Sequence, residues 1–202
     1  MTTISDDAFV RLFQERAGLD TVDGWAGRDT LAKLDELLPP RQTVDRNVAA
    51  LSIPEAYWPL LAQIESGNRP YVKASTSSAS GLYQFIRSTW EGEGGRWGAD
   101  SSKAFGGLQP SADEQLQRAK SFTAKNAAYL RQHGIPINSA SLYASHFLGV
   151  VTAAAVIGAD VRASAEALAG PAATRANPSI LKGKSVASFL QWLHDKTGEW
   201  AR

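Results

Sequence analysis

The sequence predicts an all-α fold. Apolar residues recur at helical spacing along most of the 202 residues, whereas the alternation of apolar and polar residues that marks a strand is almost absent. Several of these apolar stretches follow a serine and end at a glycine, as helices commonly do. The exception is a polar stretch, 72–80, where we expect a short irregular β excursion.

A small N-terminal module and a larger second domain are expected. Pro39 and Pro40 cannot continue a helix, and the residues after them are polar, which predicts a linker at 41–52. We therefore expect a helical module over 1–40 and a second domain over 53–202. A length of 202 residues is sufficient for a domain of about 150 residues together with one such module.

The module is expected to consist of two helices around a turn. Ser5 can cap the first helix and Gly18 can end it, and the second helix can begin at Asp29 or Thr30. The leucines that share one face of the second helix, and that we expect to be buried, are Leu31, Leu34, Leu37 and Leu38.

Helix start and stop residues also divide the second domain. A helix is expected from about Trp58 to Gly67, and a nearly all-apolar stretch, 140–157, predicts one central buried helix. The glycine-rich stretch 91–98 is expected to be a mobile loop. The residues expected to cap the later helices are Ser111, Ser139 and Ser185.

Glu65 is the candidate catalytic residue. It stands where a helix ends, beside apolar residues, and such a setting can keep a carboxyl group protonated near neutral pH, as a general acid requires. Most glutamates at helix ends are solvated surface charges. What favours a site here is the polar sequence that follows, because its side chains suit the hydroxyl and amide groups of a sugar; these residues are Asn68, Ser75, Tyr83 and Gln84.

The order and spacing of these residues resemble the soluble lytic transglycosylase family, which is goose-lysozyme-like, and its phage members above all. The motifs that carry the resemblance are Glu65-Ser66-Gly67-Asn68, Ala74-Ser75, Ala79-Ser80-Gly81-Leu82-Tyr83-Gln84-Phe85 and Thr89-Trp90. Ser78 departs from the pattern, because the family has a glycine there. The resemblance implies a lysozyme-like helical domain in which Glu65 is catalytic and the substrate is bound by Ser75, Gly81, Leu82, Tyr83, Gln84 and Phe85.

A third motif of the same family is similar to 142–149. Tyr143 and His146 lie one helical turn apart in it, so both side chains lie on one face. Their spacing fits polar tips that pack in the core equally well. In the resemblance His146 stands at the place of the family's tyrosine and Tyr143 one turn earlier, so either residue can be the one that contacts the substrate.

The turn of the N-terminal module resembles the peptidoglycan-binding helical module, although the chain is short for it. The similar residues are Val22-Asp23-Gly24-Trp25-Ala26-Gly27, followed by Thr30 and Leu31. The resemblance implies wall binding through Asp23, Gly24 and Trp25. The indole ring of Trp25 is expected to stack on a sugar or peptide surface. The alternative is a helical pair that is docked on the second domain.

These resemblances imply an enzyme, a phage endolysin. Glu65 would cleave the β-1,4 bond between N-acetylmuramic acid and N-acetylglucosamine in peptidoglycan, and the substrate itself would supply the remaining groups, which gives 1,6-anhydromuramyl ends. A hydrolytic lysozyme is one alternative, with Glu93 or Asp100 as its second carboxylate. A catalytically silent wall-binding or virion protein is the other.

Composition excludes several classes of chemistry. No cysteine is present, so disulfides, thiolate catalysis and cysteine-based zinc sites are excluded, and the three histidines are too scattered to suggest a metal site or a cofactor. A net charge of +1 gives no reason to expect a nucleic-acid partner, and no apolar run is long enough for stable membrane insertion. We expect a monomer without a signal peptide, made in the host cytoplasm and released to peptidoglycan by a holin, or carried by the virion.

Overall fold

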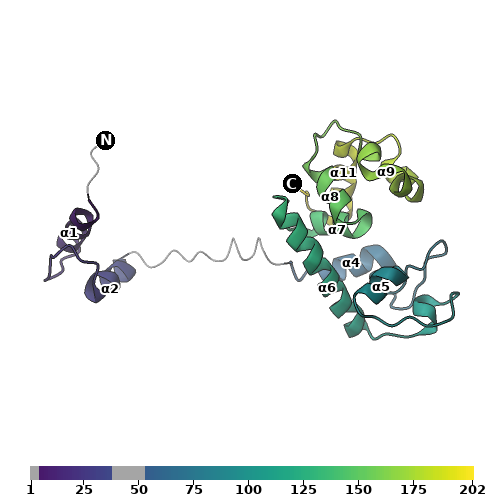
Figure 1. The fold of residues 1–202 in the computed structure, drawn as a ribbon, viewed down its shortest axis with the longest axis horizontal. Coiled ribbons are helices and arrows are strands. Elements are labelled where there is room, and N and C mark those ends of the chain that lie inside the picture. Colours follow the sequence, from purple (N-terminus) through teal and green to yellow (C-terminus); the bar gives the residue numbers. More distant parts are fainter. Residues whose placement is uncertain (1–4, 38–52) are drawn as a thin grey trace. The chain divides into compact units, whose positions relative to one another are not determined.

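The structure is a computed structural model that describes residues 5–37 and 53–202. Helices dominate these ranges, so the prediction of an all-α fold is confirmed (Figure 1). The chain divides into two compact units, 1–48 and 49–202, and each is described by itself. The linker predicted at 41–52 lies outside the described residues, as do Pro39, Pro40 and Leu38.

The N-terminal unit contains the helices α1 (Asp6–Arg16) and α2 (Arg28–Leu37). The expectation that the leucine face of α2 is buried is wrong, because Leu31 and Leu37 are about half exposed within this unit. The side chains buried between the two helices are instead the polar Gln14 and Thr30, which are joined by a hydrogen bond of 2.9 Å. Polar contacts, and not a leucine core, therefore hold this unit.

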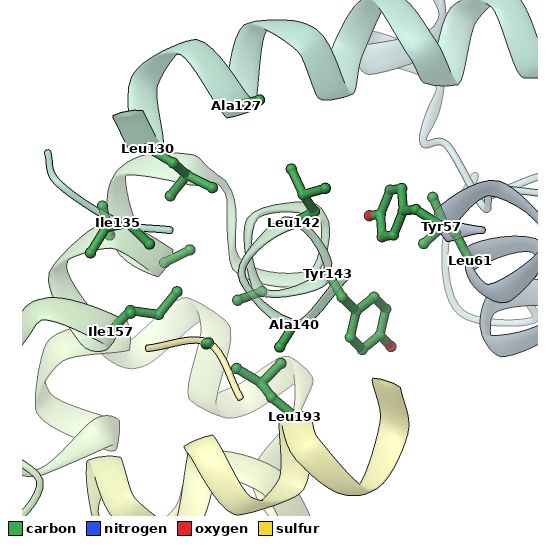
Figure 2. Close-up of a cluster of buried hydrophobic side chains, with 14 of the residues drawn as sticks. Tyr57, Leu61, Ala127, Leu130, Ile135, Ala140, Leu142, Tyr143, Ile157 and Leu193 are labelled. Atoms are coloured by element: carbon green, nitrogen blue, oxygen red, sulfur yellow. The ribbon is translucent and has the colours of Figure 1, made fainter. Parts of the chain in front are cut away.

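The second unit is a set of helices in which α7 is central, as Figure 2 shows for its hydrophobic core. In chain order they are α4 (Tyr57–Ser66), α5 (Arg87–Gly92), the 3₁₀ helix η1 (Ala104–Gly107), α6 (Ala112–Gln132), α7 (Ser139–Leu148), α8 (Val150–Gly158), α9 (Ala165–Ala176), α10 (Pro178–Leu181) and α11 (Val186–Thr197). Between α4 and α5, isolated antiparallel bridges pair Lys73 with Ser80 and Ser80 with Phe85, where the β excursion was expected.

Helix α7 packs against α6, α8 and α11, and its first seven residues, 139–145, are all buried. One continuous helix over 140–157 was expected, and this is wrong: Gly149, at φ 79° and ψ 145°, separates α7 from α8. That backbone conformation is open to almost no residue other than glycine. The cap of α7 is also one residue earlier than expected, since the Asn138 side chain accepts the Ser141 N–H at 3.0 Å.

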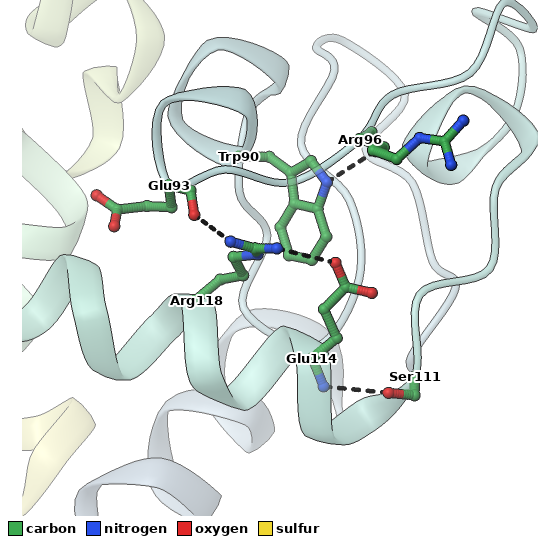
Figure 3. Close-up of polar contacts among 6 residues, drawn as sticks. All are labelled: Trp90, Glu93, Arg96, Ser111, Glu114 and Arg118. Atoms are coloured by element: carbon green, nitrogen blue, oxygen red, sulfur yellow. Dashed lines mark hydrogen bonds and ion pairs between the residues drawn. The ribbon is translucent and has the colours of Figure 1, made fainter.

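Other helix boundaries agree with expectation. Gly67 adopts the left-handed conformation (φ 60°) that ends α4, and the Ser111 hydroxyl accepts the Glu114 N–H at 3.1 Å where α6 begins (Figure 3). Ser185 caps α11 in the same way, at 3.2 Å from the Ser188 nitrogen. Serine caps and glycine stops are thus read correctly from the sequence at these three helices.

The glycine-rich stretch after α5 is fastened to its surroundings. The Trp90 indole N–H donates to the Arg96 carbonyl at 2.9 Å, and the Arg118 guanidinium of α6 donates to the Glu93 carbonyl (Figure 3). A Cβ atom on Gly95 would lie 2.2 Å from the Trp90 ring nitrogen. Here glycine permits close packing on an indole ring, a role different from the mobility expected from the sequence.

A buried glutamine on α6 anchors the loop between α4 and α5. Gln115 is 1% exposed, and its amide N–H groups donate to the carbonyls of Pro70 and Pro110, each at 3.1 Å. Its amide oxygen accepts the Leu82 N–H at 2.8 Å. Gly81 is needed beside it, because a Cβ atom there would lie 2.4 Å from the Gln115 oxygen. One side chain thus holds both ends of the loop.

We expect Gln115→Leu to lower the free energy of unfolding by about 3 kcal/mol or more, because it leaves three main-chain groups without their buried partner. Gln117→Leu, at an exposed position of the same helix, is the matched control and is expected to change stability by less than about 0.5 kcal/mol. Chemical denaturation measures both. Equal stabilities of the two variants would show that Gln115 does not anchor the loop.

Candidate active site

Glu65 lies in the last turn of α4 and is half-buried. Burial raises the pKa of its carboxyl group to about 7, although hydrogen bonding with the Tyr143 hydroxyl and the positive charge of Lys196 act in the opposite direction. These two partners come from α7 and α11, so three helices supply the surroundings of one carboxyl group. Near neutral pH a large fraction of Glu65 is therefore protonated, as a general acid must be.

A second tyrosine, which the sequence analysis did not single out, lies near Glu65. Tyr57 stands two turns earlier in α4 and is 1% exposed, and its hydroxyl has no hydrogen-bond partner. Burial raises its pKa well above the usual range, and the charges of Glu65 and Tyr143 add to the effect. Figure 2 shows the rings of Tyr57 and Tyr143 between α4 and α7.

Of the two candidates on α7, the structure brings Tyr143 to Glu65. The His146 ring packs between Phe85 and Phe122, with ring centroids at 5.5 Å and 6.0 Å. Burial lowers the pKa of His146 to about 4, and a hydrogen bond with the Tyr83 main chain opposes this only partly. His146 is therefore neutral near pH 7 and belongs to the aromatic core.

The residues 81–85 form a tight turn, and their side chains mostly support it. The Gln84 backbone has a positive φ of 48°, and its amide nitrogen donates to the carbonyls of Gly81 at 2.9 Å and Val72 at 3.3 Å. The amide oxygen of Gln84 takes part in neither bond and can contact a ligand. The other sequence-predicted residues divide by exposure: Gly81, Tyr83 and Phe85 are buried, Leu82 is half-buried and Ser75 is exposed.

The carboxylates considered for a hydrolytic mechanism are engaged elsewhere. Glu93 accepts from Lys125 at 2.8 Å and from Ser121 at 2.7 Å, and these bonds outweigh its burial and lower its pKa. Asp100 accepts from the Ser102 hydroxyl at 2.5 Å and pairs with Lys103 at 3.2 Å, and its pKa is also lowered. Both groups are ionised and already have cationic or hydroxyl partners.

The turn of the N-terminal unit is held by Gln14, which is 1% exposed. Its amide nitrogen donates to Asp23 Oδ1 at 2.9 Å and to the Trp25 carbonyl at 3.0 Å, and its oxygen accepts the Gly24 N–H at 2.9 Å. The hydrogen bond from Gln14 and one from the Trp25 N–H lower the pKa of Asp23. Gln14 thus holds the three predicted wall-binding residues, Asp23, Gly24 and Trp25, at one turn.

A cavity of ≈ 400 Å³ lies at this turn, lined by Gln14, Asp23, Trp25, Arg28 and Thr30 among others. The Trp25 side chain is 75% exposed, so its ring is available for stacking. Across the described residues of both units, no group of three or more histidine or acidic side chains could hold a metal ion. The cavity offers an aromatic ring, hydrogen-bonding groups and the charged side chains of Asp20, Asp23, Arg28 and Asp29.

No protein-family model matches this chain, and no curated protein matches it in sequence. The resemblance to lytic transglycosylases therefore rests on the quoted motifs alone.

Glu65→Gln is expected to stabilise the protein at alkaline pH. The folded protein binds the Glu65 proton more tightly than the unfolded chain does, since the pKa is raised from 4.5 to about 7. This stabilisation is complete below pH 4.5 and is lost as the pH rises through about 7. The glutamine variant should therefore gain on the order of 2 kcal/mol relative to the wild type between about pH 5 and pH 8.

Denaturation at both pH values measures this gain. Glu55→Gln, at an exposed position that precedes the same helix, is the control and should show no such gain. A stability difference between the wild type and Glu65→Gln that does not vary with pH would contradict the raised pKa.

Trp25→Ala is expected to leave the fold intact and to weaken sedimentation with purified sacculi. The ring is exposed, so its loss should change stability by less than about 0.5 kcal/mol. Phe9→Ala is the matched control, because Phe9 is an exposed aromatic residue of the same unit that does not line the cavity. Equal sedimentation of both variants and the wild type would argue against wall binding at this turn.

Proposed function

We propose that the second unit is a lytic murein transglycosylase that cleaves the β-1,4 bond between N-acetylmuramic acid and N-acetylglucosamine. The observation that carries the proposal is Glu65, a half-buried carboxyl group with a pKa of about 7 beside the Tyr143 hydroxyl. A glycosidic bond breaks when an acid protonates its bridging oxygen, and Glu65 has the protonation state for that step.

The reaction needs three events at the cleaved bond. Glu65 donates its proton to the bridging oxygen, and the C1–O bond breaks as the leaving sugar departs with that proton. The oxygen of the 2-acetamido group of the muramyl residue stabilises the positive charge at C1. Glu65, now a carboxylate, takes the proton of the muramyl 6-hydroxyl, whose oxygen bonds to C1 and closes the 1,6-anhydro ring.

Tyr143 has a defined part in this cycle. Its hydrogen bonding with Glu65 favours the carboxylate form and offsets some of the effect of burial. The pKa of Glu65 therefore stays near neutrality, where one group can give a proton in the first step and take one in the last.

The hydrolytic alternative requires a second carboxylate that activates water. Its candidates Glu93 and Asp100 are engaged with Lys125 and with Ser102 and Lys103, so neither is a free base beside the cleaved bond. This occupancy favours the substrate-assisted mechanism. The silent wall-binding alternative gains no comparable support, since a protein that only binds has no need of a carboxyl group that is costly to bury.

The wider role that we propose is that of a phage endolysin or virion-borne enzyme whose partner is the peptidoglycan glycan strand, with the N-terminal unit as a wall-binding module. It would act as a monomer without a cofactor, after holin-type release or virion delivery to the wall. Within the described residues, no helix is both long and apolar enough to cross a bilayer.

Glu65→Gln is expected to reduce clearing of a murein suspension by about 10²–10⁴-fold, because the amide is nearly isosteric but cannot donate a proton to the leaving oxygen. The fold should persist, as measured by circular dichroism. Turbidity assays measure the rate, and a variant that retains more than about one per cent of the wild-type rate would rule out Glu65 as the acid.

The products distinguish the two enzyme mechanisms. Mass spectrometry of digested sacculi should show 1,6-anhydromuramyl ends, and Asp100→Ala should keep most of the activity because no second carboxylate is used. Reducing muramyl ends together with a loss of about 10²-fold or more in Asp100→Ala or Glu93→Ala would identify a lysozyme. Absence of any fragments from the wild type would favour the silent wall-binding protein.

A further inference from the structure

One face of α11 borders the site around Glu65. The positive charge of Lys196, in the last turn of α11, acts on the Glu65 carboxyl group. Trp192 lies one helical turn before Lys196, so the two side chains share a face of the helix. Figure 2 shows the Tyr143 ring next to the helix that carries Leu193, which is α11. Trp192 is therefore a neighbour of the site on this side.

Trp192 belongs to an aromatic cluster that includes Tyr143. The centroid of its ring lies 5.8 Å from that of Tyr143, 4.9 Å from that of Phe147 and 5.6 Å from that of Phe189. Tyr143 and Phe189 are buried, whereas Trp192 is half-buried. Part of the Trp192 side chain thus reaches solvent beside the tyrosine that is hydrogen-bonded with Glu65.

The indole N–H of Trp192 is an unused hydrogen-bond donor. It bonds to no other group in the part of the chain that the structure describes, and unlike the N–H of Trp58 it is not enclosed. The N–H of Trp90, by contrast, donates to the Arg96 carbonyl at 2.9 Å. The Trp192 N–H is therefore open to a ligand that approaches Glu65.

An aromatic ring and a free N–H match the chemistry of an N-acetylated sugar. The C–H groups on one face of a sugar ring pack well on a rigid indole, which loses little conformational entropy on binding. The acetamido group adds a carbonyl oxygen that can accept the N–H. A purely apolar ligand fits less well, because it would exclude water from the N–H without giving it an acceptor.

We propose that Trp192 is a sugar-binding residue of the Glu65 site: its ring stacks on one N-acetylated sugar of the bound glycan, and its N–H donates to the acetamido oxygen of that sugar. This role rests on the function proposed for the second unit, and adds a residue outside the family motifs. Because Trp192 contacts Tyr143, the sugar that it holds is near the bond that Glu65 protonates. The contact selects N-acetylated glycans over unsubstituted ones.

Titration calorimetry of the full chain tests this role with two uncharged ligands. Chitotetraose is a short chain of β-1,4-linked N-acetylglucosamine, and cellotetraose is the equivalent glucose chain, without acetamido groups. The Glu65→Gln variant serves as the parent protein, so that neither ligand is cleaved. Saturable binding of chitotetraose is expected, about tenfold tighter than that of cellotetraose, which offers the N–H no amide oxygen.

Trp192→Phe, added to the parent, keeps an aromatic ring and removes the N–H. It should weaken chitotetraose binding about three- to tenfold and change cellotetraose binding by less than about twofold, because the contact that is lost is the one to the acetamido group. Trp192→Leu also removes the ring and should weaken both ligands by about threefold more.

Trp200→Leu is the matched control. Trp200 is 49% exposed and stacks on His194, at a centroid distance of 4.4 Å, outside the cluster around Tyr143. This variant should bind both ligands like the parent. Circular dichroism checks the fold of every variant, and Trp192→Phe, the milder change, still tests the role if Trp192→Leu does not fold.

Three results would overturn the role of Trp192. These are no saturable binding of chitotetraose by the parent, unchanged binding in both Trp192 variants, and an equal loss for both ligands in Trp192→Phe. Failure of the proposed reaction looks different. Chitotetraose binding that depends on Trp192, without any fragments from sacculi, would keep the sugar contact and remove the transglycosylase. Anhydro ends together with unchanged binding in both Trp192 variants would keep the enzyme and remove the contact.

Discussion

Burial of the first seven residues of α7, 139–145, is the constraint on which the chemistry proposed for this protein depends. The helix carries Tyr143 to Glu65, and the packing that fixes α7 also fixes the position of that hydroxyl. A carboxyl group at the end of α4 would keep an ordinary pKa if water surrounded it. Burial of the Glu65 carboxyl group raises its pKa to about 7, and the hydrogen bond with Tyr143 of α7 opposes this rise only in part. The raised pKa of Glu65 is therefore a tertiary property.

How far the sequence predicts the fold depends on what each local pattern encodes. Helix caps and helix stops depend on the chemistry of single residues. The start of α6 and the end of α4 could therefore be predicted from Ser111 and Gly67. The break at Gly149 was missed because an apolar run with one glycine has the same pattern whether the glycine is helical or extended. The prediction that the leucines of α2 are buried failed for a related reason. Periodicity shows that a helix has an apolar face, but not that another element covers this face.

The candidate site was predictable to a similar extent. Glu65 was found through its motif, whereas the choice between Tyr143 and His146 required the packing of α7, which turns His146 toward two phenylalanines. Tyr57 was missed because an aromatic residue at the start of an apolar helix is normally a core residue, and only its unpartnered hydroxyl near a carboxyl group distinguishes it.

The two glutamine anchors differ in what they hold. Gln14 binds the side chains of Asp23 and Thr30, so those two positions are tied to their residue types. Gln115 binds only main-chain groups, which every residue type offers except for the missing N–H of proline. Apart from Gly81, the loop that Gln115 fastens can therefore change in sequence without being released from α6. Under the proposed function, a change of substrate preference can arise there while the framework around Glu65 stays in place.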